Sequence, residues 1–205
     1  MNDQLSDIEE RQWTEHDYLV GIKRAIYGLW SNKIDAQTAF IQLWTTIEKG
    51  LMWAWYNGAA ECGIQSDELT QGELAALSDA IFNELQYVEQ LIYDVIEHSR
   101  DSGTKLKAWY PRLNMWANRY RDVQNQAKML ACGNQKLKWV LGPTEEHCPD
   151  CSRIAGKVKR ATTWAASGWE PQSHDLACHG YNCLCVLELT DDKLSPGKLP
   201  AAPGG

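Results

Sequence analysis

Five cysteines within 38 residues constrain this chain more than any other feature. They are Cys148, Cys151, Cys178, Cys183 and Cys185, and they lie in the segments "CPDC" and "LACHGYNCLC". The tight CxxC turn directs two thiolates toward one point, and a second pair follows after 26 intervening residues. Zinc takes four sulfur or nitrogen ligands in a tetrahedron, at distances of about 2.0 to 2.3 Å. The spacing therefore predicts a structural zinc site.

The size of the cysteine-rich segment favours the same interpretation. Residues 136–190 form a unit with few large aliphatic side chains. A unit of about 55 residues commonly needs a metal or a covalent cross-link to fold alone. Structural zinc supplies roughly 10 to 16 kcal/mol of apparent binding free energy in peptide-sized domains. We therefore expect zinc to serve as the core of this segment.

The choice of the four ligands stays open at this level. The favoured set is Cys148, Cys151, Cys178 and Cys183. Cys185 competes with Cys183, because alternate residues of a strand share a face and "CLCVLEL" alternates like a strand. His174 or His179 could also replace a cysteine. Disulfides formed outside the cell and free thiols are the two other interpretations of the cluster.

The N-terminal part of the chain predicts helices that each bury one stripe. Apolar residues recur at spacings of three and four in the segments 17–30, 35–55, 70–95 and 111–130. Asp35 is the expected cap of the second helix, and "TQGE" predicts a capping box between Thr70 and Glu73. The third helix would run for about thirty residues to "RDSG", which suggests a long antiparallel bundle or an extended surface for partners. Pro111 marks the start of the fourth helix.

Beyond residue 133 the pattern changes to short extended pieces. "KLKWVLG", "GKVKR" and "CLCVLEL" are β-like, whereas "TTWAASG" can form one or two helical turns. The tail "SPGKLPAAPGG" has three prolines and three glycines in eleven residues, so we expect it to be flexible. We predict an α+β fold in three parts: a helical domain of about four helices (1–133), a β-rich zinc module (134–192) and the tail (193–205).

Charge is distributed unevenly along the chain. Residues 1–110 hold 8 basic and 18 acidic side chains, whereas residues 111–205 hold 12 and 9, within an overall net charge of −7. The basic residues between positions 105 and 160 are Lys105, Lys107, Arg112, Arg119, Arg121, Lys128, Lys136, Lys138, Arg153, Lys157, Lys159 and Arg160. Such a stripe could face phosphate or an acidic protein surface, or it could be an ordinary solvated face.

The chain has no run of 18 apolar residues, and its acidic, polar start lacks the plan of a signal peptide. We therefore expect an intracellular protein without a membrane segment. Clustered cysteines in that reducing compartment are metal ligands more often than disulfides. Cys62 and Cys132 fall at helix ends, where we expect small buried residues. Most of the ten tryptophans are expected in the core, and exposed ones would serve protein contacts.

Four segments of the C-terminal half together resemble a known family. They are "LKWVLGPTEEHCPDCSRIAGKV", "WAASGWEPQS", "LACHGYNCLC" and "VLEL". In order and spacing they resemble the C-terminal domain of phage head morphogenesis proteins, the Mu-like minor head proteins. That family's pattern is a tryptophan strand, CPxC, a following glycine, a proline-containing loop and a terminal CxC. The resemblance covers residues 113–190. Many members have a histidine and a proline before the final CxC, where this chain has "CHGYN" with Cys178.

The resemblance implies a minor structural protein of a tailed-phage capsid that takes part in head morphogenesis. Its expected partners are the portal protein, the major capsid protein and packaged DNA. Its expected location is the virion head, reached from the host cytoplasm during assembly. Nothing in this interpretation requires catalysis, so we do not expect an enzyme.

Two alternatives from other classes remain. An HNH-like, zinc-supported nuclease would use His174, His179 and Asn182, which lie near the cysteines. Such chemistry needs a further histidine ligand at helical spacing, and the sequence lacks it. A DNA-binding regulator would use the cysteine module and the basic segment, although the chain as a whole is acidic.

Overall fold

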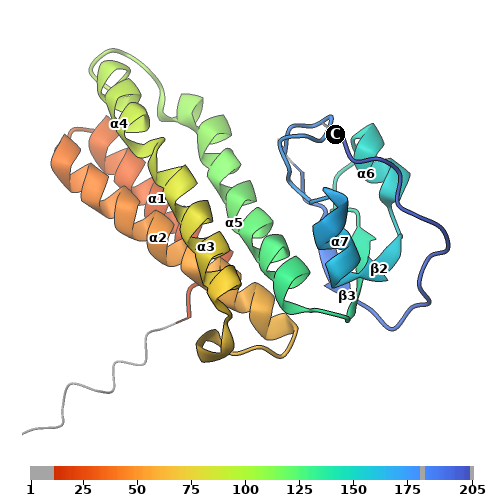
Figure 1. Cartoon of the computed structure of the whole chain (residues 1–205). Helices are drawn as coiled ribbons and strands as arrows, with labels where there is room; N and C mark the ends of the chain where they lie inside the picture. Colours follow the sequence, from red (N-terminus) through yellow and green to blue (C-terminus); the bar gives the residue numbers. More distant parts are fainter. Residues whose placement is uncertain (1–11, 181–182, 204–205) are drawn as a thin grey trace, which may run out of the picture.

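Two hydrophobic cores share one helix, α5 (Tyr110–Ala131). The computed structural model describes residues 12–180 and 183–203. The first core lies in a bundle that α5 forms with α1 (Glu15–Trp30), α2 (Ala36–Glu61), α3 (Gln71–Leu85) and α4 (Val88–Glu97). The second core belongs to a small module beside the C-terminal end of α5 (Figure 1). Helices with one small antiparallel sheet confirm the expected α+β fold.

The starts of the bundle helices follow their capping residues. The Thr14 side chain accepts a hydrogen bond from the Asp17 N–H three residues later, and α1 starts at the residue after this cap, Glu15. Asp35 accepts from the Thr38 N–H at 2.7 Å, as expected for α2. The predicted capping box of α3 is present, because Thr70 and Glu73 bond reciprocally. These bonds satisfy amide groups that a helix start otherwise leaves without partners.

The expected third helix of about thirty residues is wrong, because the segment is divided into α3 and α4. At the division the Tyr87 N–H bonds to the Glu84 carbonyl, three residues back. This tighter turn ends the regular α-helical bonding. No glycine or proline stands at the division, so no local residue signals it in the sequence. Among the described residues the bundle therefore has five helices where about four were expected, and residues 71–97 do not form one continuous helix.

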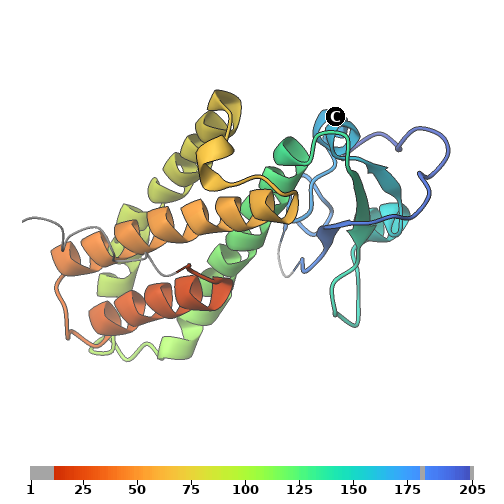
Figure 2. The same ribbon diagram turned by 90° about the horizontal axis from the view of Figure 1, so that it is seen from below.

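The module is built on a three-stranded antiparallel sheet in the order β2-β1-β3. Its strands are β1 (Lys136–Val140), β2 (Val158–Arg160) and β3 (Val186–Leu189). Two short helices, α6 (Pro149–Ile154) and α7 (Ala161–Ser167), complete it. Figure 2 shows the C-terminal ends of α2 and α5 meeting beside this sheet. The three expected extended pieces and the short helix are confirmed, but α6 was not predicted.

Tryptophans form the centre of the module. Trp139, Trp164 and Trp169 are fully buried, and the Trp139 ring lies 5.7 Å from Trp164 and 6.3 Å from Trp169 between centroids. Buried aromatic rings of this size contribute large apolar areas. The expectation that zinc alone would serve as the core is therefore wrong. A core of aromatic rings adjoins the cysteines in one cluster.

The C-terminal segment differs from the flexible tail that its composition predicts. The Ser195 N–H donates to the Val158 carbonyl, and the Trp169 indole donates to the Pro200 carbonyl at 2.9 Å. Leu199 packs against the second core. Residues 193–203 thus lie along the module with defined partners (Figure 1). Composition predicted flexibility because prolines and glycines suit loops, but these backbone groups find donors and acceptors on the module.

The expectation that most tryptophans serve the cores is confirmed. Among the tryptophans of the described ranges, Trp44 alone is exposed, at 39%. A surface of several exposed tryptophans for partners is therefore wrong. Among residues 12–180 and 183–203, no helix combines the length and the apolar character that crossing a bilayer requires.

Candidate metal centre

All five clustered cysteines converge on one region of the module. The sulfur atoms form two groups of three, and within each group all three atoms lie within 4.8 Å of one another. The two groups share Cys151. One group adds Cys148 and Cys178, and the other adds Cys183 and Cys185. These two groups are the ones found among the described residues. The cluster is positioned to hold a metal ion.

The sulfur spacing fits a tetrahedral metal. The Sγ atoms of Cys151 and Cys183 lie 3.9 Å apart. A metal with four sulfur ligands at about 2.3 Å has sulfur–sulfur edges of about 3.8 Å by tetrahedral geometry. The pair can therefore sit on one ion with little movement. With five thiols present, one is in excess of the four that such an ion holds.

The first two thiols are placed by the start of α6. Cys148 caps this helix, and its Sγ accepts a hydrogen bond from the Cys151 N–H at 3.3 Å. Pro149 follows at the first helical position, where its missing N–H has no consequence. The CxxC segment is thus a helix start, in which the spacing of three residues brings both sulfurs to one side. The pair "CP" is the signal by which α6 could have been recognised.

The other thiols come from the loop before β3. This strand starts at Val186, so Cys183 and Cys185 precede it and the argument from alternating strand faces was wrong. Both side chains nevertheless reach Cys151, because the loop is fixed by other contacts. The Gln172 amide donates to the carbonyls of Cys183 and Cys185, which holds the loop against the cluster.

Electrostatics in the metal-free cluster oppose the ionisation of most thiols. Hydrogen bonds to Cys183 and Cys185, followed by burial, raise the pKa of Cys151. Burial raises the pKa of Cys178 to about 12. Cys183 has a lowered pKa, because Cys151 and Cys185 donate hydrogen bonds to its thiolate. A cation at the centre of the cluster would favour ionisation of these thiols, since the thiolate is the form that binds metals.

The histidines considered as substitute ligands lie apart from both groups of thiols. The rings of His174 and His179 contact each other in a tilted arrangement, with centroids 5.2 Å apart. His179 Nδ1 bonds to the His174 carbonyl at 2.9 Å. Neither ring belongs to a three-residue group that could hold a metal among the described residues. Asn182, the third residue of the nuclease alternative, lies outside the described residues.

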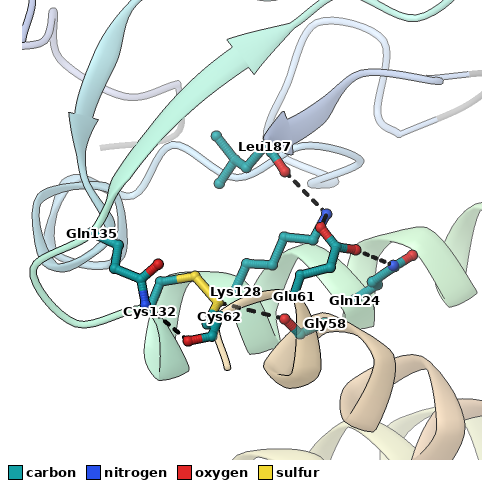
Figure 3. Close-up of a disulfide and its surroundings, with 8 residues drawn as sticks. All are labelled: Gly58, Glu61, Cys62, Gln124, Lys128, Cys132, Gln135 and Leu187. Atoms are coloured by element: carbon teal, nitrogen blue, oxygen red, sulfur yellow. Dashed lines mark hydrogen bonds and ion pairs between the residues drawn. A yellow bond between two sulfur atoms is a disulfide. The ribbon is translucent and has the colours of Figure 1, made fainter. Parts of the chain in front are cut away.

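A buried polar face of α5 attaches the module to the bundle, and sequence reasoning missed it. The residues of this face, which we call the polar seam, are Asn118, Asp122, Asn125 and Lys128, all at least 92% buried. Asn125 accepts from the Leu187 N–H and donates to Gln172, each at 2.9 Å. Lys128 donates to the Leu187 carbonyl and pairs with Glu61 at 2.7 Å (Figure 3). The seam thus links α2, α5, β3 and the cysteine loop.

A disulfide joins the ends of α2 and α5 beside the polar seam. Cys62 and Cys132 are buried as expected, but they are also bonded to each other, with Cα atoms 5.0 Å apart (Figure 3). The Gln135 amide donates to the Cys62 carbonyl, which fixes the turn into β1 on the same ends. Seventy residues separate the two cysteines in sequence, so no local pattern pairs them. The chain therefore divides its cysteines into one bonded pair and five clustered thiols.

Most of the basic segment is occupied by contacts within the chain. Lys136 donates to the carbonyls of Asp191 and Asp192, and Lys159 donates to carbonyls of the C-terminal segment. Further partners inside the chain hold Arg112, Arg119, Arg121, Lys128, Lys138, Arg153 and Arg160. A side chain that is already bonded has less to offer a phosphate. Most of the basic residues in the segment 105–160 therefore stabilise the fold through hydrogen bonds and ion pairs within the chain.

Comparison with known proteins assigns no relative to this chain. No family model, no curated protein and no solved structure matches it. The role of the thiol cluster must then follow from its own geometry. That geometry is two groups of thiols that share Cys151, three of the five thiols being buried, next to a tryptophan core and tied to the polar seam through Gln172.

Proposed function

We propose that the cysteine cluster binds one structural zinc ion. Thiolates at tetrahedral spacing are the ligands that zinc prefers, and zinc asks for no redox change. The residues that would hold it are Cys148, Cys151, Cys178 and Cys183, with Cys185 as the competing fifth. When bound, the ion would supply the charge that keeps the thiols ionised and would join α6 to the loop before β3.

We further propose that the chain is a minor head protein of a tailed phage, with a structural role in head morphogenesis. One observation carries this proposal: the segments that resemble the family pack together in one module. Trp139 from the first segment contacts Trp164 and Trp169 from the second, and the cysteines of the first and third segments meet at Cys151. The family pattern thus matches the residues that hold this module together. Portal and capsid proteins, with packaged DNA nearby, are the proposed partners.

The architecture supports a docking role better than either alternative. Buried hydrogen bonds of the polar seam join the module to the bundle, which suits a protein that holds two partners together. The nuclease alternative lacks support, because no histidine joins a metal-holding group among the described residues. The DNA-binding regulator is weakened by the internal partners of the basic segment.

The composition of purified particles tests the proposed function. Particles would be produced from the phage genome that encodes this chain, purified by density gradient and analysed by quantitative mass spectrometry. We expect the chain in mature heads and in assembly intermediates, at a few copies for each portal ring. A matched control is a nonstructural protein of the same genome, which should be lost on purification. Absence of the chain from both kinds of particle would reject the proposal.

A further inference from the structure

The five clustered thiols are arranged as two triangles of sulfur atoms that share one corner, Cys151. The first triangle adds Cys148 and Cys178, and the second adds Cys183 and Cys185. Among these described thiols, three at a time lie within 4.8 Å of one another, but no four do. A structural zinc ion takes four ligands, so it would have to draw thiols of both triangles around one centre. As it stands, the arrangement offers two positions with three sulfurs each.

A triangle of this size has room for one ion bound by three thiolates. The edge between the sulfur atoms of Cys151 and Cys183 measures 3.9 Å. An ion at the centre of an equilateral triangle with that edge would lie about 2.3 Å from each sulfur, which is the length of a metal–thiolate bond. An iron–sulfur cluster does not fit, because thiols this close together leave no space for iron and sulfide between them.

In the first triangle, backbone N–H groups serve the two outer sulfurs. The Cys151 N–H donates to Cys148 Sγ at 3.3 Å. The backbone of Gly180 bonds to Cys178 in the sense that stabilises its thiolate, so the Gly180 N–H is the donor. Hydrogen bonds from N–H groups disperse the negative charge of metal-bound thiolates. The two outer sulfurs are thus prepared to bind a metal as thiolates.

The outer sulfurs of the second triangle have donors of the same kind. The Gln172 side-chain amide donates to Cys183 Sγ at 3.8 Å. The Gly142 N–H donates to Cys185. Gly142 can approach this closely because it has no side chain: a Cβ there would lie 2.4 Å from the Leu184 carbonyl oxygen. Both triangles therefore have N–H groups at their outer corners.

The shared sulfur has different surroundings. Side-chain hydrogen bonds link the buried Cys151 thiol to the thiols of Cys148, Cys183 and Cys185. A thiolate has enough lone pairs to bind two metal ions at once, and such a sulfur has the least need of an N–H donor. Its place in both triangles makes Cys151 the ligand that would bridge two ions.

We infer that the cluster has two metal positions bridged by the sulfur of Cys151, and that two monovalent copper ions, Cu(I), bind there. Thiolates select this soft ion, and its filled d shell lets it accept three sulfurs without a fourth ligand. Two zinc ions fit less well, because each would need a fourth ligand and no histidine joins either triangle among the described residues. Five thiolates and two Cu(I) ions leave three negative charges, which the N–H donors at the outer sulfurs offset. The inference rests on the proposed metal-binding role of the cluster, but not on zinc as its occupant.

A copper titration of the purified full chain tests this inference. The chain is used as purified, with its disulfide intact, so that the free thiols are those of the cluster. Cu(I) is added under nitrogen as its acetonitrile complex, in competition with bicinchoninate, whose colour reports the copper that the protein has not bound. Zinc that copper displaces is counted in the same samples. We expect two Cu(I) for each chain, and copper X-ray absorption should show three sulfurs around each copper and a second copper nearby.

Variants distinguish two positions from one. Cys178→Ser and Cys185→Ser each break one triangle, so each should lower the count from two Cu(I) to one. Cys151→Ser breaks both triangles and should weaken the binding of both ions at least about tenfold. The control variant Cys62→Ala/Cys132→Ala, outside the cluster, should keep two. Far-ultraviolet circular dichroism verifies that each variant is folded before copper is added.

A count of one Cu(I), or of three or more, in the unmodified chain would overturn the inference. So would a Cys185→Ser variant that keeps two ions, since Cys185 would then be a spare thiol beside a single site. The zinc count separates this failure from failure of the proposed function. A chain that is purified with zinc but does not bind two Cu(I) would refute the two positions and leave the zinc site standing, whereas a chain that holds neither metal would refute both.

Discussion

Replacement of Asn125 by alanine should detach the cysteine module from the bundle more than any other change of one polar side chain. Asn125 is 1% exposed and lies at the centre of the polar seam. Its Oδ1 accepts from the Leu187 N–H near the start of β3, and its Nδ2 donates to Gln172 Oε1. Gln172 in turn holds the loop of Cys183. Asn125→Ala removes both bonds and leaves their partners buried.

The expected loss of stability follows from those two partners. A buried donor or acceptor that loses its only partner costs about 1 to 3 kcal/mol. Two such groups give a loss of roughly 2 to 6 kcal/mol in the free energy of unfolding. Part of the loss should be local, because Gln172 can no longer orient the cysteine loop. We therefore also expect faster hydrogen exchange at the Leu187 amide.

Urea unfolding followed by tryptophan fluorescence measures the global effect, and amide exchange measures the local one. Asn114→Ala is the matched control, because Asn114 lies exposed on the same helix. Its effect should stay within about 0.5 kcal/mol. In the double variant Asn125→Ala/Gln172→Ala, the two losses should be less than additive, since the residues share a bond. A loss for Asn125→Ala no larger than that of the control would refute the role of the seam.

Three further perturbations have defined outcomes. Burial raises the pKa of Glu170 from 4.5 to about 8, so the folded state holds a proton that the unfolded state releases. Stability should therefore fall as pH rises from about 5 to 8, and Glu170→Gln should flatten that slope in thermal melts and gain about 1 to 3 kcal/mol at pH 8; equal slopes would contradict this. Reduction of the Cys62–Cys132 disulfide should lower the free energy of unfolding by roughly 2 to 4 kcal/mol. The variant with both cysteines replaced by alanine should show no such loss when reductant is added. A variant that reductant destabilises as much as the original protein would contradict this role of the disulfide. Deletion of residues 194–205 should remove the partner of the Trp169 indole, lower stability by about 1 to 3 kcal/mol and shift tryptophan emission to the red. An unchanged emission spectrum would mean that the tail leaves Trp169 covered.

Local signals predicted the helices and most of the module. Capping residues such as Thr70 and Asp35 act within one helical turn, so their effect can be read from neighbouring letters. The five cysteines were found by their density, and the structure does bring them together. The division between α3 and α4 escaped prediction, because the apolar spacing continues through it and no breaking residue stands there.

The contacts between distant segments could not be predicted. The polar residues of the seam suggest a solvated face when read alone, and their burial depends on β3, some sixty residues away. The Cys62–Cys132 pair likewise depends on how α2 and α5 end together. The tail resembled a linker in composition, but its carbonyl groups serve Trp169 and Lys159. In each case tertiary partners outweighed the local preference.

X-ray absorption at the zinc edge, combined with elemental analysis of the purified chain, tests whether the cysteine cluster holds zinc. We predict about one zinc for each chain, surrounded by four sulfur atoms at about 2.3 Å and by no nitrogen or oxygen ligand. Cys148→Ser should lower zinc retention, whereas Cys62→Ala, outside the cluster, should not. Protein that carries less than half an equivalent of any metal, with all five clustered thiols reactive in the folded state, would contradict the account.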